Sequence, residues 1–271
     1  MTVHALKDQT ELWLPLLRQL TEASLDWAVW KNADAGLSGA GDVDFIAPVG
    51  DWGTVEHHFL RWARAGELGP VIVCRHAPGA LFLIAVNEGG QPWLQLDVRA
   101  RVTLRGATVF RAREVATSMI VDARGFRRLR PGAEGALKLV ISGLAPGGRP
   151  NHSGLRKEHV AELLREDPGG VEATARLLGR ARPALLSGAR AAARGGWDRG
   201  AMLRVEAYVM SRGSLEPWVA AGQVAMRRAK KRCPVLATGI AHGRRIPGER
   251  AAWLRRVHET HIVHGLEPCD D

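Results

Sequence analysis

Cysteine is scarce in this 271-residue chain, and it has no long hydrophobic run. The three cysteines, Cys74, Cys233 and Cys269, are far apart and form no Cys-x-x-Cys pair. This pattern excludes a disulfide framework and a cysteine-based zinc site, so we expect reduced thiols. No stretch approaches the ~20 uncharged apolar residues of a membrane span. Charged residues interrupt the apolar positions of the N-terminal stretch, unlike in a secretory signal. We therefore expect a cytoplasmic protein without a membrane span.

A phosphate-binding P-loop is also missing. The stretch at 237–245, ATGIAHGRR, has two glycines but not the spacing GxxxxGK[ST]. A Walker-type kinase or ATPase site is therefore not indicated.

Positive charge is in excess, with 38 Lys and Arg residues against 28 Asp and Glu and a net charge of +10. Such a balance favours a polyanionic ligand such as a nucleotide or nucleic acid. Nine arginines lie between Arg99 and Arg130, against only two acids. They could attract a triphosphate or an RNA backbone, or they could be a solvated face of an arginine-rich chain. The sequence leaves both interpretations open.

Apolar periodicity predicts an α+β chain with two domains. In order, we expect a helix, two strands, a helix and three strands, over residues 8–23, 26–32, 42–48, 51–65, 70–76, 80–86 and 93–104. A loop at 33–41 joins the first two strands. This order indicates a mixed sheet. After residue 130, segments with helical periodicity alternate with Gly and Pro, the last at 247–263. We predict a mixed-sheet domain at 1–130 and an all-helical domain at 131–271.

Three aspartates carry the predicted chemistry. Asp42 and Asp44 begin an apolar strand and project to one side, whereas Val43 and Phe45 point into the core. Asp97 interrupts a later apolar strand on its polar face. Carboxylates on neighbouring strands form a hard-oxygen site suited to Mg²⁺ or Mn²⁺ and to two-metal phosphoryl or nucleotidyl transfer.

Two simpler explanations of the paired aspartates stay open. Asp42 could simply end a turn while Asp44 faces solvent on an edge strand, because Gly and Asp are common in turns. The chain could also be a relative that keeps the acids without catalysis.

The stretches AVWKNADAGLSGAGDVDFIAP (28–48) and LQLDV (94–98) resemble the DNA polymerase β-type nucleotidyltransferase superfamily. More narrowly, they are similar to uncharacterised bacterial nucleotidyltransferase-like proteins. The shared signature is an apolar strand, a tight turn, a short helical stretch, an acid–apolar–acid pair and a third acid on a later strand. The resemblance covers about residues 24–104.

The resemblance implies a nucleotidyltransferase-like fold and a metal-dependent reaction. A nucleoside monophosphate would pass from a nucleoside triphosphate to a hydroxyl or phosphate acceptor, with release of pyrophosphate. Asp42 and Asp44 would hold the metal at the triphosphate. Asp97 would complete the second metal site and help to deprotonate the acceptor.

The resemblance also implies which residues contact the nucleotide. Ser38, Gly39 and Gly41 would lie beside the phosphates. The family usually has a Gly-Ser turn where this chain has Lys31 and Asn32, so we expect Lys31 to contact the β- and γ-phosphates as a point charge.

Two further cations complete the predicted nucleotide contacts. Arg99 begins the arginine run. Lys138 lies in GALKLVISG, where a helix closes over the nucleotide in related two-domain transferases; its alternative is a lysine that snorkels to the surface.

The acceptor would be a small molecule or RNA, with a tRNA end as one possibility. The alternative function is an inactive module that binds nucleic acid or a protein through its basic surface.

Overall fold

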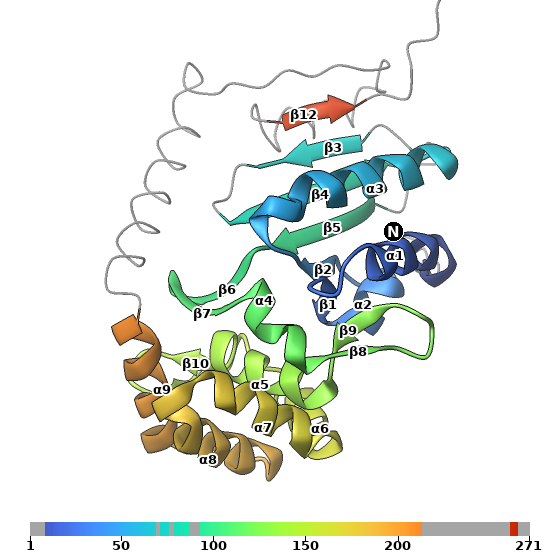
Figure 1. Cartoon of the computed structure of the whole chain (residues 1–271). Helices are drawn as coiled ribbons and strands as arrows, with labels where there is room; N and C mark the ends of the chain where they lie inside the picture. Colours follow the sequence, from blue (N-terminus) through green and yellow to red (C-terminus); the bar gives the residue numbers. More distant parts are fainter. Residues whose placement is uncertain (1–8, 69–70, 76–78, 87–92, 213–260, 265–271) are drawn as a thin grey trace, which may run out of the picture.

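The computed structural model describes residues 9–68, 71–75, 79–86, 93–212 and 261–264 of the chain. This part is α+β, with a mixed sheet in one half and a group of helices in the other (Figure 1). None of the described helices combines the length and the apolar character that crossing a membrane requires.

The main sheet has the strand order β12-β3-β4-β5-β2-β1-β9-β8. The pairs β2–β5 and β1–β9 are parallel, and the other neighbours are antiparallel. The strands are β1 (Ala28–Lys31), β2 (Val43–Ile46), β3 (Val71–Cys74), β4 (Ala80–Val86), β5 (Trp93–Arg99), β8 (Met119–Val121), β9 (Arg127–Leu129) and β12 (His261–His264).

The predicted helix–strand order is confirmed up to β5, with two differences. The expected loop at 33–41 contains the short helix α2 (Ala33–Leu37). The expected strand at 93–104 breaks after β5, and β6 (Arg101–Leu104) pairs with β7 (Ala107–Arg111) outside the main sheet. Strands β7, β8 and β9 were not predicted; they have only five, three and three residues.

Helices α1 (Thr10–Ala23) and α3 (Trp52–Ala65) cover one face of the sheet (Figure 1). Val55, Phe59 and Trp62 form an apolar stripe on α3 that is buried in this core. Trp62 stacks on Trp13 of α1 with ring centroids 5.2 Å apart. Val43 and Phe45 of β2 point into the same core, so the other face of β2 is left for the acids.

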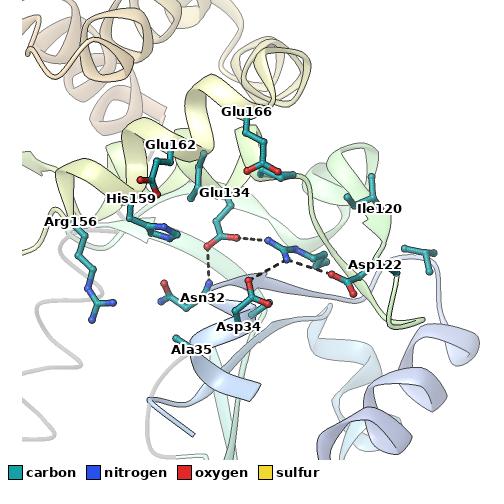
Figure 2. Close-up of a pocket in the computed structure, with 16 residues that line it drawn as sticks. Asn32, Asp34, Ala35, Ile120, Asp122, Glu134, Arg156, His159, Glu162 and Glu166 are labelled. Atoms are coloured by element: carbon teal, nitrogen blue, oxygen red, sulfur yellow. Dashed lines mark hydrogen bonds and ion pairs between the residues drawn. The ribbon is translucent and has the colours of Figure 1, made fainter. Parts of the chain in front are cut away.

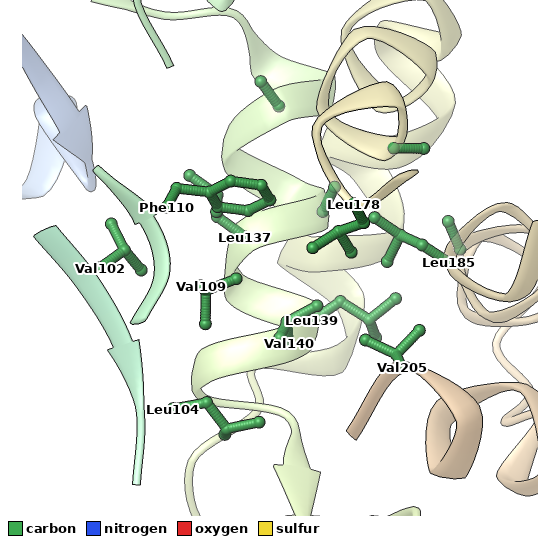
Figure 3. Close-up of a cluster of buried hydrophobic side chains, with 14 of the residues drawn as sticks. Val102, Leu104, Val109, Phe110, Leu137, Leu139, Val140, Leu178, Leu185 and Val205 are labelled. Carbon is green, nitrogen blue, oxygen red and sulfur yellow. The ribbon is translucent and has the colours of Figure 1, made fainter. Parts of the chain in front are cut away.

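The second core surrounds α5 (Pro131–Ile141). Figure 3 shows α5 between the β6–β7 hairpin and the later helices, with Phe110 on one side and Leu185 and Val205 on the other. Trp30 and Ile46 of the sheet belong to this core as well. The sheet and the helical segment therefore share hydrophobic packing near the ends of β1 and β2.

The described residues after α5 are mainly helical. They form α6 (Lys157–Glu166), α7 (Pro168–Leu177), α8 (Arg182–Ala193), α9 (Arg199–Arg212) and the two-residue strands β10 (Leu144–Ala145) and β11 (Arg149–Pro150). One-turn elements are η1 (Val49–Asp51), α4 (Ala112–Val115), η2 (Ala116–Ser118) and η3 (Gly179–Ala181).

The C-terminal segment differs from the all-helical prediction at its end. Residues 261–263, expected in a helix, belong to β12, which pairs with β3 at the edge of the sheet. The helices expected within 213–260 lie outside the described residues.

Candidate functional site

The register of β2 and β5 places two of the predicted acids side by side. Asp44 and Asp97 are direct partners in this parallel pair, and both are buried, with 8% and 7% of their surface exposed. Asp42 lies exposed one residue before β2. Because β2 lies between β5 and β1, the alternative of an edge strand for Asp44 is wrong.

A β-bulge at Trp30 brings Lys31 onto the acid face. Val29 pairs with Phe45, but the next partner of Asp44 is Lys31 rather than Trp30. In a regular ladder Lys31 would stand opposite Val43 and point to the other face, since side chains alternate. The extra residue instead places the Lys31 Nζ 2.9 Å from Asp44 Oδ2.

The tight turn after β1 forms without a glycine. Asn32 has φ 51° and ψ 34°, in the left-handed region. Asn tolerates this region better than most residues that have a Cβ atom. The Asn32 backbone N–H donates to Glu134 Oε1 at 2.7 Å. Asn32 therefore makes the left-handed turn, and Glu134 of α5 binds the backbone there.

The buried acids of the sheet have polar partners, but these partners offset only part of their negative charge. Gln95 donates to Asp97 Oδ1 at 2.7 Å, and an Arg99 nitrogen lies 3.7 Å from Asp97 Oδ2. Burial, reinforced by the charges of Asp42 and Asp44, raises the pKa of Asp97 to about 6. Burial also raises the pKa of Asp44, although Lys31 acts in the opposite direction.

The donor chemistry of this face fits Mg²⁺ or Mn²⁺. Asp42, Asp44 and Asp97 offer hard carboxylate oxygens, which these ions prefer. In their present positions, no three His, Cys, Asp or Glu side chains of the described residues form a group that could hold a metal ion. Lys31 is bound to Asp44, and Asp97 is bound by Gln95. Metal binding would therefore require these contacts to rearrange.

The residues expected beside the phosphates have structural contacts. The Ser38 hydroxyl donates to the Ala35 carbonyl at 3.1 Å, at the end of α2. Gly39 has φ 79°, and a Cβ atom there would lie 2.6 Å from the Gln9 side chain. Gly41 faces open space. Close packing explains the glycine at position 39, and only Gly41 offers an open approach.

Lys138 is buried rather than snorkelling, with 6% of its surface exposed. Its ammonium lies 2.6 Å from Glu134 Oε1 and 2.9 Å from His159 Nε2. An ammonium can only donate, so His159 Nε2 accepts and its proton is on Nδ1. Burial lowers the pKa of Lys138 although Glu134 opposes this. Sequence reasoning missed Glu134 and His159; the i,i+4 spacing of Glu134 and Lys138 was the available signal.

A pocket of about 760 Å³ lies where the sheet meets the helical segment. Figure 2 shows Asn32 and Asp34 on one wall, and His159 and Glu162 of α6 on another. Glu134 lies between the two walls. Because Asn32 directly follows Lys31, the pocket adjoins the turn that carries Lys31.

Arg128 joins the acids at one end of this pocket. Its guanidinium lies 3.6 Å from Glu134, 3.5 Å from Asp122 and 3.8 Å from Asp34. One partly buried guanidinium thus lies near three carboxylates of the pocket.

Most arginines of the run have a partner elsewhere in the chain. Arg124 pairs with Asp122 at 2.8 Å, Arg127 donates to the Thr21 carbonyl at 3.0 Å, and Arg130 binds Asp167. Arg99 is the member that reaches the acid face. Much of the charge of this run is therefore paired within the chain, although Arg105, Arg111 and Arg113 are exposed.

No family model matches the chain, and no curated protein or solved structure shows significant similarity to it.

Proposed function

We propose that this protein is a metal-dependent nucleotidyltransferase of the DNA polymerase β type. The observation that carries the proposal is the pairing of Asp44 with Asp97 on adjacent parallel strands, with Asp42 two residues before Asp44. Asp44 and Asp97 are buried more deeply than they are neutralised, and burial raises the pKa of both. Perturbed carboxylates of this kind are typical of functional sites.

The proposed reaction is an in-line displacement at the α-phosphorus of a nucleoside triphosphate. An acceptor oxygen forms the new bond to phosphorus, the bond to the β-phosphate breaks, and pyrophosphate leaves. Bound Mg²⁺ or Mn²⁺ would supply charge neutralisation for the developing transition state. Asp42 and Asp44 would hold the metal at the triphosphate, and Asp97 would take part in binding the second metal and in deprotonating the acceptor.

Cations beside the acids would orient the triphosphate. Lys31 lies at the acids, and Arg99 approaches from the neighbouring strand. Lys138 lies close enough to Lys31 for its pKa to be affected by it. We place the phosphates between these side chains.

The pocket favours a small-molecule acceptor over RNA. Its volume of about 760 Å³ lies within the ~300–1,000 Å³ of typical ligand pockets. It adjoins the Lys31 turn, whereas Arg124, Arg127 and Arg130, which could serve an RNA backbone, are already paired within the chain.

A pyrophosphate-release assay tests the proposal. Each of the four nucleoside triphosphates is supplied with Mg²⁺ or Mn²⁺, with and without total tRNA. We expect release with the wild-type protein and a loss of about 10³-fold or more in Asp44→Asn. Asp26→Asn, which changes an acid paired with Arg113 away from the site, is the matched control and should keep the wild-type rate.

The assay also separates the alternatives. A rate in Asp44→Asn equal to that of the wild type, with an unchanged circular dichroism spectrum, would contradict the mechanism. Release that requires tRNA would identify RNA as the acceptor. No release with any nucleotide, together with salt-sensitive RNA binding that persists when all three acids are changed to Asn, would favour the binding module.

A further inference from the structure

Lys31 occupies the place at Asp44 that a divalent cation would need. We propose that Lys31 is a built-in counter-ion that releases Asp44 when the metal binds and then binds the triphosphate. One side chain would thus serve the metal site and the phosphate site in turn. This inference rests on the proposed function and adds an order of events to it.

The contact between Lys31 and Asp44 is built by the local backbone. The bulge at Trp30 is needed to bring Lys31 opposite Asp44. The left-handed turn at Asn32, bound by Glu134, follows immediately. The Lys31 ammonium also lies 5.0 Å from the centre of the Trp30 ring, a cation–π contact. Lys31 lies between a bulge and a left-handed residue, so the backbone directs its side chain toward Asp44. Bulges commonly re-aim a side chain next to a functional site.

Lys31 and a divalent ion would compete for the same carboxylate. The ammonium lies 2.9 Å from Asp44 Oδ2, in the space around an oxygen that Mg²⁺ or Mn²⁺ would coordinate. An ammonium and a divalent cation also repel each other at this range. Metal affinity in the absence of nucleotide should therefore be lower than the three carboxylates alone would give.

The displaced ammonium has a new partner only when an anion is present. Lys138 and Arg156 are cations of the helical segment, and both Lys31 and Arg156 affect the pKa of Lys138. A phosphate placed between Lys31 and Lys138 would relieve the repulsion between the two ammonium groups. The metal and the triphosphate would therefore favour each other's binding, with Lys31 as the link.

Lys31→Met tests the exchange, because it removes the charge and keeps an unbranched side chain over Trp30. The probes are Mn²⁺ alone, followed by electron paramagnetic resonance, and Mn²⁺ with a non-hydrolysable nucleoside triphosphate, followed by calorimetry. We expect about three- to tenfold tighter binding of Mn²⁺ alone and about tenfold weaker binding of the nucleotide. Lys31→Arg is the matched control. It should change the affinity for Mn²⁺ alone and the affinity for the nucleotide in the same directions as Lys31→Met, but by smaller factors.

Opposite changes in the two affinities would support the exchange. Unchanged or weaker binding of Mn²⁺ alone in Lys31→Met would overturn it, and the proposed function would stand if pyrophosphate release still depended on Asp44. No Mn²⁺ binding by the wild type or by Lys31→Met would overturn both.

A second measurement uses the wild-type protein and does not depend on the folding of Lys31→Met. The side-chain ¹⁵N resonance of Lys31, assigned by its absence in Lys31→Arg, should shift when Mg²⁺ is added. A resonance that stays unchanged at saturating Mg²⁺ would overturn the exchange.

Discussion

In this protein, the surroundings of two groups of partly or fully buried acids shift their pKa values in opposite directions. On the sheet, burial raises the pKa of Asp97 to about 6. In the arginine-rich segment, hydrogen bonds from Arg124 are the main reason that the pKa of Asp122 falls to about 2. Both are aspartates with an arginine nearby, so residue type does not explain the difference.

The number and geometry of the partners explain it. Asp122 accepts from the Arg124 side chain through both oxygens and from the Arg124 backbone N–H, and Arg128 lies 3.5 Å away. Asp97 accepts one amide hydrogen bond from Gln95, and the nearest Arg99 nitrogen is 3.7 Å away. The Asp122 charge is therefore satisfied, whereas the Asp97 charge retains capacity for another cation. Incomplete neutralisation distinguishes the proposed catalytic acids from the structural ones.

Asp97→Asn should produce the largest effects: turnover should fall, and stability should rise. Turnover should fall by about 10³-fold, because Asp97 is a proposed metal ligand. Stability at pH 8 should rise by at most about 3 kcal/mol, the equivalent of a shift from 3.8 to about 6. Urea denaturation at several pH values measures the second effect.

The sign of this pH dependence follows from the raised pKa. Near pH 3 Asp97 is protonated in both the folded and the unfolded chain and costs nothing. As the pH rises from about 4 to 6, the unfolded chain loses its proton first, so the wild type loses stability. The Asp97→Asn variant has no carboxyl group to ionise at this position. Its greater stability over the wild type should therefore disappear near pH 3. Equal stability of the two proteins at pH 8 would contradict the contrast between the two groups of acids.

Asp167→Ala should show the complementary behaviour, with stability lost and turnover kept. Asp167 binds Arg130 and also accepts from the backbone N–H of Gly170 at 2.9 Å, as the N-cap of α7. Loss of an N-cap costs about 1 kcal/mol, and loss of the ion pair adds to it, so the melting temperature should fall by several degrees.

Asp167→Asn separates the two contributions, because Asn can still cap the helix but carries no charge. Although burial opposes it, the bonds from Arg130, Gly170 and Gly132 lower the pKa of Asp167. Its stabilising effect should therefore be present above about pH 4 and be lost as the pH falls further. A large loss of turnover at a temperature where Asp167→Ala is folded would show that this acid is not merely structural.

Local sequence patterns predicted which side chains share a face of one strand. The arrangement of the strands depends on pairings between residues that are distant in the sequence. Alternation in 93–99 placed Gln95, Asp97 and Arg99 on one face, because side-chain direction in a strand has a period of two. The pairing of β2 with β5 and the bulge in β1 depend on neighbouring strands. Arg127 contacts Thr21, more than 100 residues earlier, so counting charge along the run could not show that it is paired within the chain.

The resemblance to nucleotidyltransferases located the acids but not their counter-ions. Lys31 was expected at the phosphates, and the structure places it on Asp44. Lys138 of α5 was expected at the nucleotide or at the surface, yet it is buried and pairs with Glu134, one helical turn earlier. The prediction of a helix over 247–263 followed periodicity, which cannot show that residues 261–263 pair with β3.

Changes at Asn32 should have the smallest effect and test the turn that carries Lys31. A residue with a Cβ atom is strained at φ 51°, so Asn32→Ala should lower the free energy of unfolding by about 1 kcal/mol. Asn32→Gly removes that strain and should be as stable as the wild type or slightly more, since glycine adopts the left-handed region freely. Both variants keep the backbone N–H that Glu134 accepts, so their difference reports the backbone conformation alone. Urea denaturation of the two variants side by side gives the comparison. Equal stability of the Ala and Gly variants would exclude the left-handed turn, and with it the geometry that holds Lys31 at Asp44.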